Sequence, residues 1–256
     1  MIMKKFRNKN FNKILKVIFS VVVVLLISAT LSRSVPDGTL DYVYENKTMG
    51  KKAIALTFDD GPGKHTESLL DGLAKNDAKV TFFVVGNKAE KYPETLKRAY
   101  DEGHLIGSHT YNHIDFYKRS LNNIKSDISR NVEVIESITG EKPIFLRAPY
   151  GNVTPVQLKQ LDTVFIHWSV STLDWYREEE EFVYDRLMSV AKDGAIILLH
   201  DTRETTVDAV LRAIPQLKAQ GYEFVRVDEL LTRNGDEIKT GIPYRSCKHD
   251  SYPVAY

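Results

Sequence analysis

Cysteine is nearly absent from this chain, which has 256 residues and a single cysteine, Cys247. One thiol cannot build an internal disulfide framework, nor can it supply the set of cysteine ligands that a cysteine-based structural zinc site needs. Any bound metal ion must therefore be held by histidine, aspartate or glutamate. The composition, with 43% hydrophobic and 27% charged residues, is that of one large or two small globular domains and excludes a disordered or fibrous chain.

A large excess of charge of either sign is also lacking, because the formal net charge is only +1. Seven of the 35 basic residues, and no acidic residue, lie in residues 1–33. The rest of the chain therefore has 28 basic against 34 acidic residues, a net charge of −6. No stretch beyond residue 34 resembles the basic stripe of a nucleic-acid-binding protein, so we expect no nucleic-acid partner.

One long uncharged apolar run, residues 17–31, follows directly behind the N-terminal basic cluster. This order is typical of a targeting segment whose basic end stays in the cytoplasm. With Ile14 and Leu15 included, the run reaches the lower limit of a membrane span, and no Ala-x-Ala cleavage site is evident. We predict that residues 1–33 form a cytoplasmic tail and a single-pass cell-membrane anchor, with a cleaved signal peptide and secretion as the alternative. Residues 34–52 are predicted to be a linker to an extracytoplasmic domain.

Strand and helix patterns alternate over residues 53–232. Buried β-type runs predict strands at 53–58, 80–85, 105–106, 144–146, 164–170, 195–199 and 224–227. Helical spacing predicts helices at 66–75, 93–102, 121–139, 155–161, 182–191 and 206–220. This alternation indicates an α/β fold with a barrel-like or doubly wound parallel sheet, and we expect a distorted (β/α) barrel of about seven parallel strands. Residues 233–256 are predicted to be an irregular C-terminal tail.

Unusual polar and aromatic residues follow the predicted strands, always just past the C-terminal end. In chain order they are Asp59 and Asp60, His109 and His113, Arg147 and Tyr150, Asp174 and Trp175, and His200 and Asp201. In a parallel barrel this rim is where active sites are assembled from several strand ends. We therefore expect these residues to meet at one site.

The histidine pair suggests the ligand chemistry. His109 and His113 are four residues apart, a spacing that on one helical turn would point both imidazoles the same way. One carboxylate from the pair Asp59 and Asp60 would complete two histidines and one acid with a position open for water, as in a catalytic zinc site. Non-haem iron would also suit this set. We expect one divalent metal ion, with zinc preferred and cobalt or manganese as alternatives.

Five short segments together resemble the motifs of the polysaccharide deacetylases, carbohydrate esterase family four with the NodB-homology fold. They are Thr57-Phe58-Asp59-Asp60, His109-Thr110-x-x-His113, Arg147-Ala148-Pro149-Tyr150, Asp174-Trp175 and Leu198-Leu199-His200. Their order and approximate spacing match the family over roughly residues 50 to 232. Each segment alone is weak evidence, whereas five in order are a strong signal.

The resemblance implies that Asp60, His109 and His113 hold the metal ion and that Asp59 is the general base. The further roles that it implies are Arg147 to hold Asp59, His200 as general acid, Asp174 to orient His200, and Tyr150, Trp175 and Leu198 as substrate contacts. One position departs from the family, which often has another acid where Ser171 stands. We expect altered groove contacts there and unchanged chemistry.

The expected function is removal of N-acetyl groups from a cell-wall glycan, and peptidoglycan N-acetylglucosamine is the substrate that we expect. We expect the protein to be exported and to be a monomer. Within the same chemistry, the alternatives are chitin oligosaccharides, acetylxylan and N-acetylmuramic acid. An alternative of another class is a wall-binding module without activity. The presence of Asp59, Arg147 and His200 beside the metal-binding set argues against it, because a binding module does not need them.

Overall fold

The computed structural model describes residues 51–247. The predicted basic tail, the predicted membrane anchor and nearly all of the predicted linker lie outside the described residues, and so does the end of the predicted tail. Within the described part, no helix is long and apolar enough to cross a membrane.

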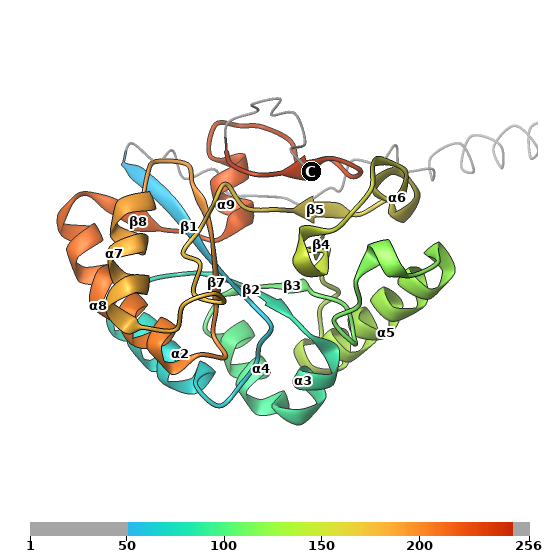
Figure 1. Cartoon of the computed structure of the whole chain (residues 1–256), viewed down its shortest axis with the longest axis horizontal. Coiled ribbons are helices and arrows are strands. Elements are labelled where there is room, and N and C mark those ends of the chain that lie inside the picture. The colour runs from blue at the N-terminus through green and yellow to red at the C-terminus, as the bar shows by residue number, and fades with distance from the viewer. Residues whose placement is uncertain (1–50, 248–256) are drawn as a thin grey trace, which may run out of the picture. The chain divides into compact units, whose positions relative to one another are not determined.

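Parallel strands form one sheet at the centre of the fold (Figure 1). The strands are β1 (Lys52–Asp59), β2 (Thr81–Val84), β3 (Leu105–Ser108), β4 (Phe145–Leu146), β5 (Val164–Ile166), β6 (Val170–Ser171), β7 (Ile196–His200), β8 (Tyr222–Phe224) and β9 (Pro243–Tyr244). Their spatial order is β6-β7-β1-β2-β3-β4-β5-β9, and β8 pairs with the start of β1. Every strand pair in the described sheet is parallel.

The sheet curls into a barrel, and the chain itself shows why. Strands β5 and β6 lie near opposite ends of the spatial order, yet only residues 167–169 separate them in sequence. Because these few residues can span at most about 14 Å, the two ends of the sheet must come close together. Ser246, just past β9, also forms an antiparallel bridge with Ala195 in front of β7. The described residues therefore form a curled, parallel-stranded α/β fold that fits the expected distorted barrel, with nine strands in place of about seven.

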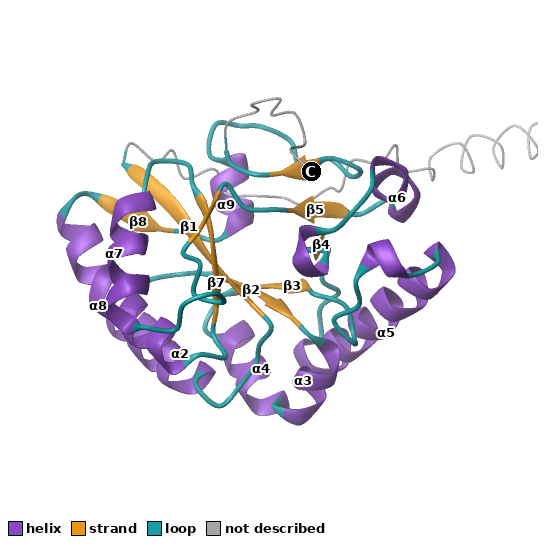
Figure 2. Ribbon diagram, in the orientation of Figure 1, coloured by secondary structure: helices purple, strands orange, loops and turns teal. Residues whose placement is uncertain are grey.

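Helices surround the strands on the outside (Figure 2). They are α2 (Thr66–Lys75), α3 (Gly86–Lys91), α4 (Pro93–Asp101), α5 (Leu121–Thr139), α6 (Pro155–Leu161), α7 (Glu180–Val190), α8 (Glu204–Ala219) and α9 (Val227–Thr232), with short 3₁₀ turns η1 (Phe116–Lys118) and η2 (Pro149–Gly151). Helix α5 begins after Ser120, whose side chain accepts a hydrogen bond from the Asn123 N–H, and ends at Gly140 with φ 84°.

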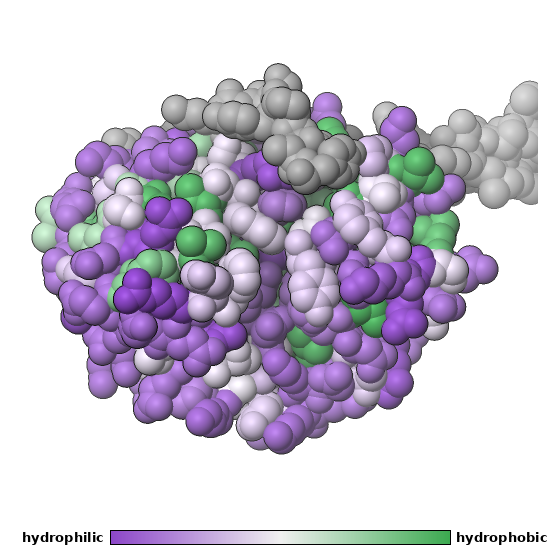
Figure 3. All heavy atoms as spheres, viewed as in Figure 1, coloured by the Kyte–Doolittle hydropathy of each residue, from purple (hydrophilic) through white to green (hydrophobic). Residues whose placement is uncertain are grey.

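Residues of β1 are buried along nearly its whole length, as a central strand covered on both faces requires. Hydrophilic residues dominate the outer face in Figure 3, where hydrophobic residues form small separate groups.

Two of the predicted strands need correction. The run 164–170 is not one strand, because the chain leaves the β4–β5 ladder after Ile166 and pairs with β7 only from Val170. The run 224–227 is also divided: β8 ends at Phe224, and α9 begins at Val227. The side chain of Glu229 accepts a hydrogen bond from the Arg226 N–H and caps this helix.

The described chain continues past residue 232, where the sequence patterns stop. Strand β9 pairs with β5, and the N–H of His167 donates to the Tyr244 carbonyl at 2.7 Å. The Cys247 N–H donates to the Gly194 carbonyl, and the Cys247 side chain is buried. Residues 233–247 therefore belong to the packed barrel.

Candidate metal centre and catalytic site

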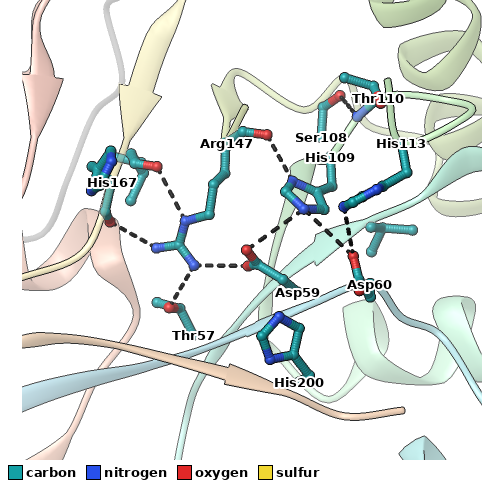
Figure 4. Close-up of polar contacts among 12 residues, drawn as sticks. Thr57, Asp59, Asp60, Ser108, His109, Thr110, His113, Arg147, His167 and His200 are labelled. Carbon is teal, nitrogen blue, oxygen red and sulfur yellow. Dashed lines mark hydrogen bonds and ion pairs between the residues drawn. The ribbon is translucent and has the colours of Figure 1, made fainter. Parts of the chain in front are cut away.

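The C-terminal ends of β1, β3, β4 and β7 bring the predicted site residues together. Asp59 is the last residue of β1 and is the register partner of His200 at the end of β7. His109 directly follows β3, and Arg147 directly follows β4, the next strand in the sheet. Figure 4 shows Asp59, Asp60, His109, His113 and Arg147 linked by a continuous set of contacts, with the ring of His200 close by.

Asp60, His109 and His113 form a cluster with the geometry of a metal site. One ligand atom from each lies within 4.8 Å of the other two. Oδ1 of Asp60 is 3.1 Å from Nε2 of His113 and 3.6 Å from Nε2 of His109. This oxygen is buried and accepts no well-aligned hydrogen bond from the described residues. A divalent cation would satisfy it, so the residues present fit the expected metal ion.

His109 is oriented for this task by the backbone. Its Nδ1–H donates to the carbonyl of Arg147 at 2.7 Å, which leaves the lone pair of Nε2 facing Asp60. Burial lowers the pKa of His109, although the neighbouring Asp59 and Asp60 carboxylates oppose the shift. The ring is therefore neutral, the form in which histidine binds a metal ion.

The turn that carries both histidines is not helical, which corrects the expectation of a single helical turn. Thr110 and His113 have φ values of 66° and 54°, in the left-handed region. The imidazole rings nevertheless meet, with their centroids 5.0 Å apart. The left-handed backbone conformation of these two residues brings the two imidazole rings together, as helical spacing was expected to do.

Helix α5 supports this turn through two side chains that the sequence analysis did not single out. The carboxylate of Asp127 accepts hydrogen bonds from the N–H groups of Tyr111 and Asn112 at 2.7 and 3.0 Å. The buried Asn131 amide donates to the Ser108 hydroxyl and the Val84 carbonyl, both at 2.9 Å. A signal for Asn131 exists in the sequence, because it occupies a core position of the apolar helical repeat of α5.

Asp59 is the second carboxylate of the site, and Arg147 holds it. Nη1 of the fully buried Arg147 donates to Oδ1 of Asp59 at 2.8 Å and to the Thr57 hydroxyl at 2.7 Å. Its other nitrogens donate to the carbonyls of Ile166 and His167. The other carboxylate oxygen, Oδ2, lies 3.6 Å from Nε2 of His109. Asp59 therefore keeps one oxygen directed toward the metal cluster.

His200, at the end of the neighbouring strand β7, is paired with Asp174. Nδ1 of His200 is 2.9 Å from Oδ1 of Asp174, and its backbone N–H donates to Oδ2 of the same carboxylate at 2.8 Å. The Thr206 hydroxyl also donates to Oδ2, so the buried carboxylate is fully engaged. Burial lowers the pKa of His200, but the hydrogen bond and charge of Asp174 outweigh it and raise the pKa to about 9. His200 is therefore protonated at neutral pH.

The three predicted substrate contacts take different positions. The Tyr150 ring packs edge-on against His113 with the centroids 4.9 Å apart, and 65% of the residue is exposed. Trp175 is half exposed, on the loop between β6 and α7. Leu198 is buried in β7, two residues before His200 and hence on the same face of the strand.

All the large hydrophobic residues exposed in the described structure belong to segments that follow the C-terminal ends of strands. They are Tyr117, Tyr150, Val156, Trp175 and Tyr176. The sequence analysis did not single out Tyr117, Val156 or Tyr176, because exposure cannot be seen in a sequence. Of these residues, Tyr150 contacts the metal cluster directly, through the ring of His113.

The comparisons with known proteins agree with this geometry. The family model described as polysaccharide deacetylase matches residues 46–163. Peptidoglycan-N-acetylglucosamine deacetylase PgdA of Listeria monocytogenes is 37% identical over 199 residues, which are 77% of this chain and 42% of the relative. Peptidoglycan-N-acetylmuramic acid deacetylase PdaA of Bacillus subtilis is 36% identical over 191 residues, 71% of this chain and 72% of the relative.

A solved structure shares the fold as well. A family 4 acetyl xylan esterase from Clostridium thermocellum, in complex with a cobalt ion, is 33% identical with a TM-score of 0.71, over 76% of this chain and 98% of the other. The chain spans less than half the length of PgdA but most of the length of PdaA. The similarity to PdaA, the family-model match and the five segments around the metal cluster establish that this chain belongs to the polysaccharide deacetylase family.

Proposed function

We propose that this protein is a metal-dependent hydrolase that removes N-acetyl groups from cell-wall polysaccharide, with peptidoglycan N-acetylglucosamine as its substrate. One observation carries the proposal. A metal-binding cluster of two histidines and Asp60 lies beside a second carboxylate, Asp59, that is tied to Arg147 and not needed as a ligand. A binding module would need neither this second carboxylate nor the charged His200.

The donor set of two imidazoles and one carboxylate suits zinc, which we propose as the ion, with cobalt or manganese as alternatives. When bound, the ion would polarise the acetyl carbonyl and lower the pKa of a water molecule. The protein must then supply a base for the water, an acid for the leaving amine and donors for the developing oxyanion. A backbone N–H near Tyr150 is our proposed oxyanion donor beside the metal ion.

Asp59 is the proposed general base. It lies at the end of β1, where Arg147 donates to Oδ1 and holds the carboxylate in place. Because Oδ2 points toward the metal cluster, it is placed to take the proton of the attacking water. The hydrogen bonds of Arg147 to two backbone carbonyls hold the guanidinium still, so the carboxylate that it anchors is held as well.

His200 is the proposed general acid. Cleavage of the C–N bond releases a strongly basic amine, which must receive a proton as it leaves. The ion pair with Asp174 keeps the imidazolium charged and fixes its orientation through Nδ1. Nε2–H is then the donor that faces the site. Asp59 and His200, as register partners on β1 and β7, would act from neighbouring strand ends.

The choice of substrate rests on the relatives and on the predicted location of the domain. PgdA is named for N-acetylglucosamine, PdaA for N-acetylmuramic acid, and the solved esterase for acetylated xylan. We propose peptidoglycan N-acetylglucosamine, because the predicted export segment would place the domain against the cell wall. The alternatives are N-acetylmuramic acid, chitin oligosaccharides and acetylxylan. The proposed location is the outer face of the cell membrane, and the proposed active form is a monomer.

The test is acetate release by the purified chain from peptidoglycan, with chitin oligosaccharides and acetylxylan as competing substrates. Asp59→Asn should lower the rate by about 10²–10⁴-fold, because the base is lost while its shape is kept. Bound metal should not change in this variant, since Asp59 is not a ligand. The matched control is Asp101→Asn, which changes an exposed carboxylate of α4 and should keep the full rate.

Full activity of Asp59→Asn would refute the assignment of the base. Release of acetate from acetylxylan but not from N-acetylated glycans would refute the substrate and leave the metal-dependent chemistry in place. No acetate from any of these glycans, together with retained glycan binding, would favour the inactive wall-binding module.

A further inference from the structure

A further buried carboxylate, Asp201, lies beside the site and has no part in the chemistry described above. It directly follows His200, and it is completely buried. One of its oxygens, Oδ1, accepts no hydrogen bond within the described residues. A buried acid is costly to keep, so its contacts should indicate what it does.

Those contacts lead to the turn that follows Asp60. The Thr66 hydroxyl donates to Oδ2 of Asp201 at 2.5 Å and accepts a hydrogen bond from the Gly63 N–H at 2.8 Å. The carboxylate of Asp201 also lies directly against Gly61, where an added Cβ would collide with it. Asp201 and Thr66 therefore contact one side of the turn formed by residues 60–63.

The other side of this turn is held by α3 and the residue before it. The Lys88 ammonium donates to the Asp60 carbonyl at 2.7 Å, and the Val85 N–H donates to the Gly61 carbonyl at 3.0 Å. Between these supports, Asp60 has a φ of 70°, a conformation that a non-glycine residue rarely adopts. Such a conformation persists only where the surroundings enforce it, and here it directs the Asp60 carboxylate at the two histidines.

We propose that Asp201 and Thr66 are positioning residues that clamp the 60–63 turn and so hold Asp60 in its metal-binding conformation. The inference rests on the proposed function only in taking Asp60 as a ligand. Strand β7 would then have two roles: it supplies His200, and through Asp201 it supports the metal ligand Asp60 after β1. Burial raises the pKa of Asp201 to about 7, although the bond from Thr66 opposes the shift. Asparagine has the same shape and keeps an oxygen that can accept the hydrogen bond from the Thr66 hydroxyl, so it is a fair substitute.

Three variants separate the clamp from other effects. Thr66→Val keeps the shape and removes the hydroxyl, Asp201→Ala removes the contact with Gly61, and Asp201→Asn keeps both the shape and an acceptor for Thr66. The matched control is Thr139→Val, which removes a buried hydroxyl that bonds to the Ile135 carbonyl in α5. Circular dichroism and thermal unfolding select the conditions in which all variants are folded.

The first readout is affinity for Zn²⁺ and Co²⁺, measured by competition with a chelator and without any substrate. Thr66→Val and Asp201→Ala should weaken binding by about 10–100-fold, the usual effect of removing a residue that supports a ligand. Asp201→Asn and Thr139→Val should bind like the parent protein. Two results would overturn the clamp. One is that Thr66→Val and Asp201→Ala both bind the metal ions with the affinity of the parent protein. The other is that Asp201→Asn binds as weakly as Asp201→Ala while Thr66→Val keeps the parent affinity.

The second readout needs neither metal nor activity. Hydrogen exchange of the Val85 amide, which donates to Gly61, reports directly on the turn in chelator-treated protein. We expect exchange about tenfold faster in Thr66→Val and Asp201→Ala than in Thr139→Val. Unchanged exchange of the Val85 amide in Thr66→Val and Asp201→Ala would overturn the clamp. Faster exchange would support the clamp whether or not the protein proves to be a deacetylase.

Discussion

At the scale of single residues, the adjacent acids Asp59 and Asp60 show how the backbone divides two roles between like side chains. Asp59 still belongs to β1, and its buried side chain is directed at Arg147. The left-handed conformation of Asp60 instead turns its carboxylate toward the histidines. The sequence alone left open which of the two is the ligand, because strand alternation says only that they point apart.

His200 provides a prediction at the same scale. In the EDTA-treated protein its imidazole should titrate near pH 9, because burial is outweighed by the hydrogen bond and charge of Asp174. Asp174→Asn removes that charge, so the pKa of His200 should fall from about 9, because burial is then opposed only by the charges of Asp59 and Asp60. NMR titration of the His200 ring proton measures the shift. An unchanged pKa in Asp174→Asn would contradict the assigned pairing, and His104, with a pKa held near 4 by its burial, is the internal control.

The same pair implies a pH dependence of stability with a definite sign. Because the folded-state pKa of His200 is raised, its stabilising contribution is complete below about pH 6.5 and is lost as the pH rises through about 9. The difference in unfolding free energy between the parent protein and Asp174→Asn should therefore shrink across this interval. Urea titrations at pH 6 and pH 10 would show it.

At the scale of elements, local patterns predicted six of the helices, whereas the six-residue helices α3 and α9 were not predicted. The ranges 66–75, 121–139 and 155–161 agree with α2, α5 and α6, because apolar spacing and end residues such as Gly140 are local signals. The patterns failed where a partner distant in sequence decides. Residues 164–170 are mostly apolar and read as one strand, yet the run divides because β4 and β9 pair with its start and β7 with its end.

Strand β9 gives the prediction that belongs to this scale. A chain ending at residue 241 loses the β5 partner, the acceptor for the His167 N–H and the buried Tyr244 side chain. We expect the free energy of unfolding to fall by about 3–5 kcal/mol, the usual cost of removing a buried aromatic residue. Urea denaturation measures it, and a chain ending at residue 247, which keeps every one of these contacts, is the control. Equal stability of the two truncated chains would show that β9 does not support the barrel.

At the scale of the whole molecule, the site depends on the curvature of the sheet. Residues from the ends of four strands meet only because the sheet curls. The alternation of strands and helices, with polar residues after each strand, predicted that these residues would lie together. The supporting residues were not predictable in the same way. Asp127, Asn131 and Asp201 act through contacts across the fold. Asn131 leaves a trace in the helical pattern, and Asp201 was expected at the rim of the sheet, but no pattern indicated their supporting roles.

Metal binding should therefore stabilise the entire domain, since the three ligands come from two loops far apart in the chain. An ion supplied at 100 times its dissociation constant adds about 2.7 kcal/mol to the free energy of unfolding. For a domain of this size that corresponds to a rise in Tm of about 5–10 °C, measured by calorimetry with and without zinc.

Two neighbouring variants make this prediction specific. Asp59→Asn should keep the rise in Tm, because this carboxylate is bound to Arg147 and is not a ligand, whereas Asp60→Asn should lose most of it. Adjacent residues with the same chemistry are thus each other's control, and any general effect of losing a charge near the site is common to both. A rise that survives in Asp60→Asn, or vanishes in Asp59→Asn, would show that the ion is held by a different set of side chains from the one assigned here.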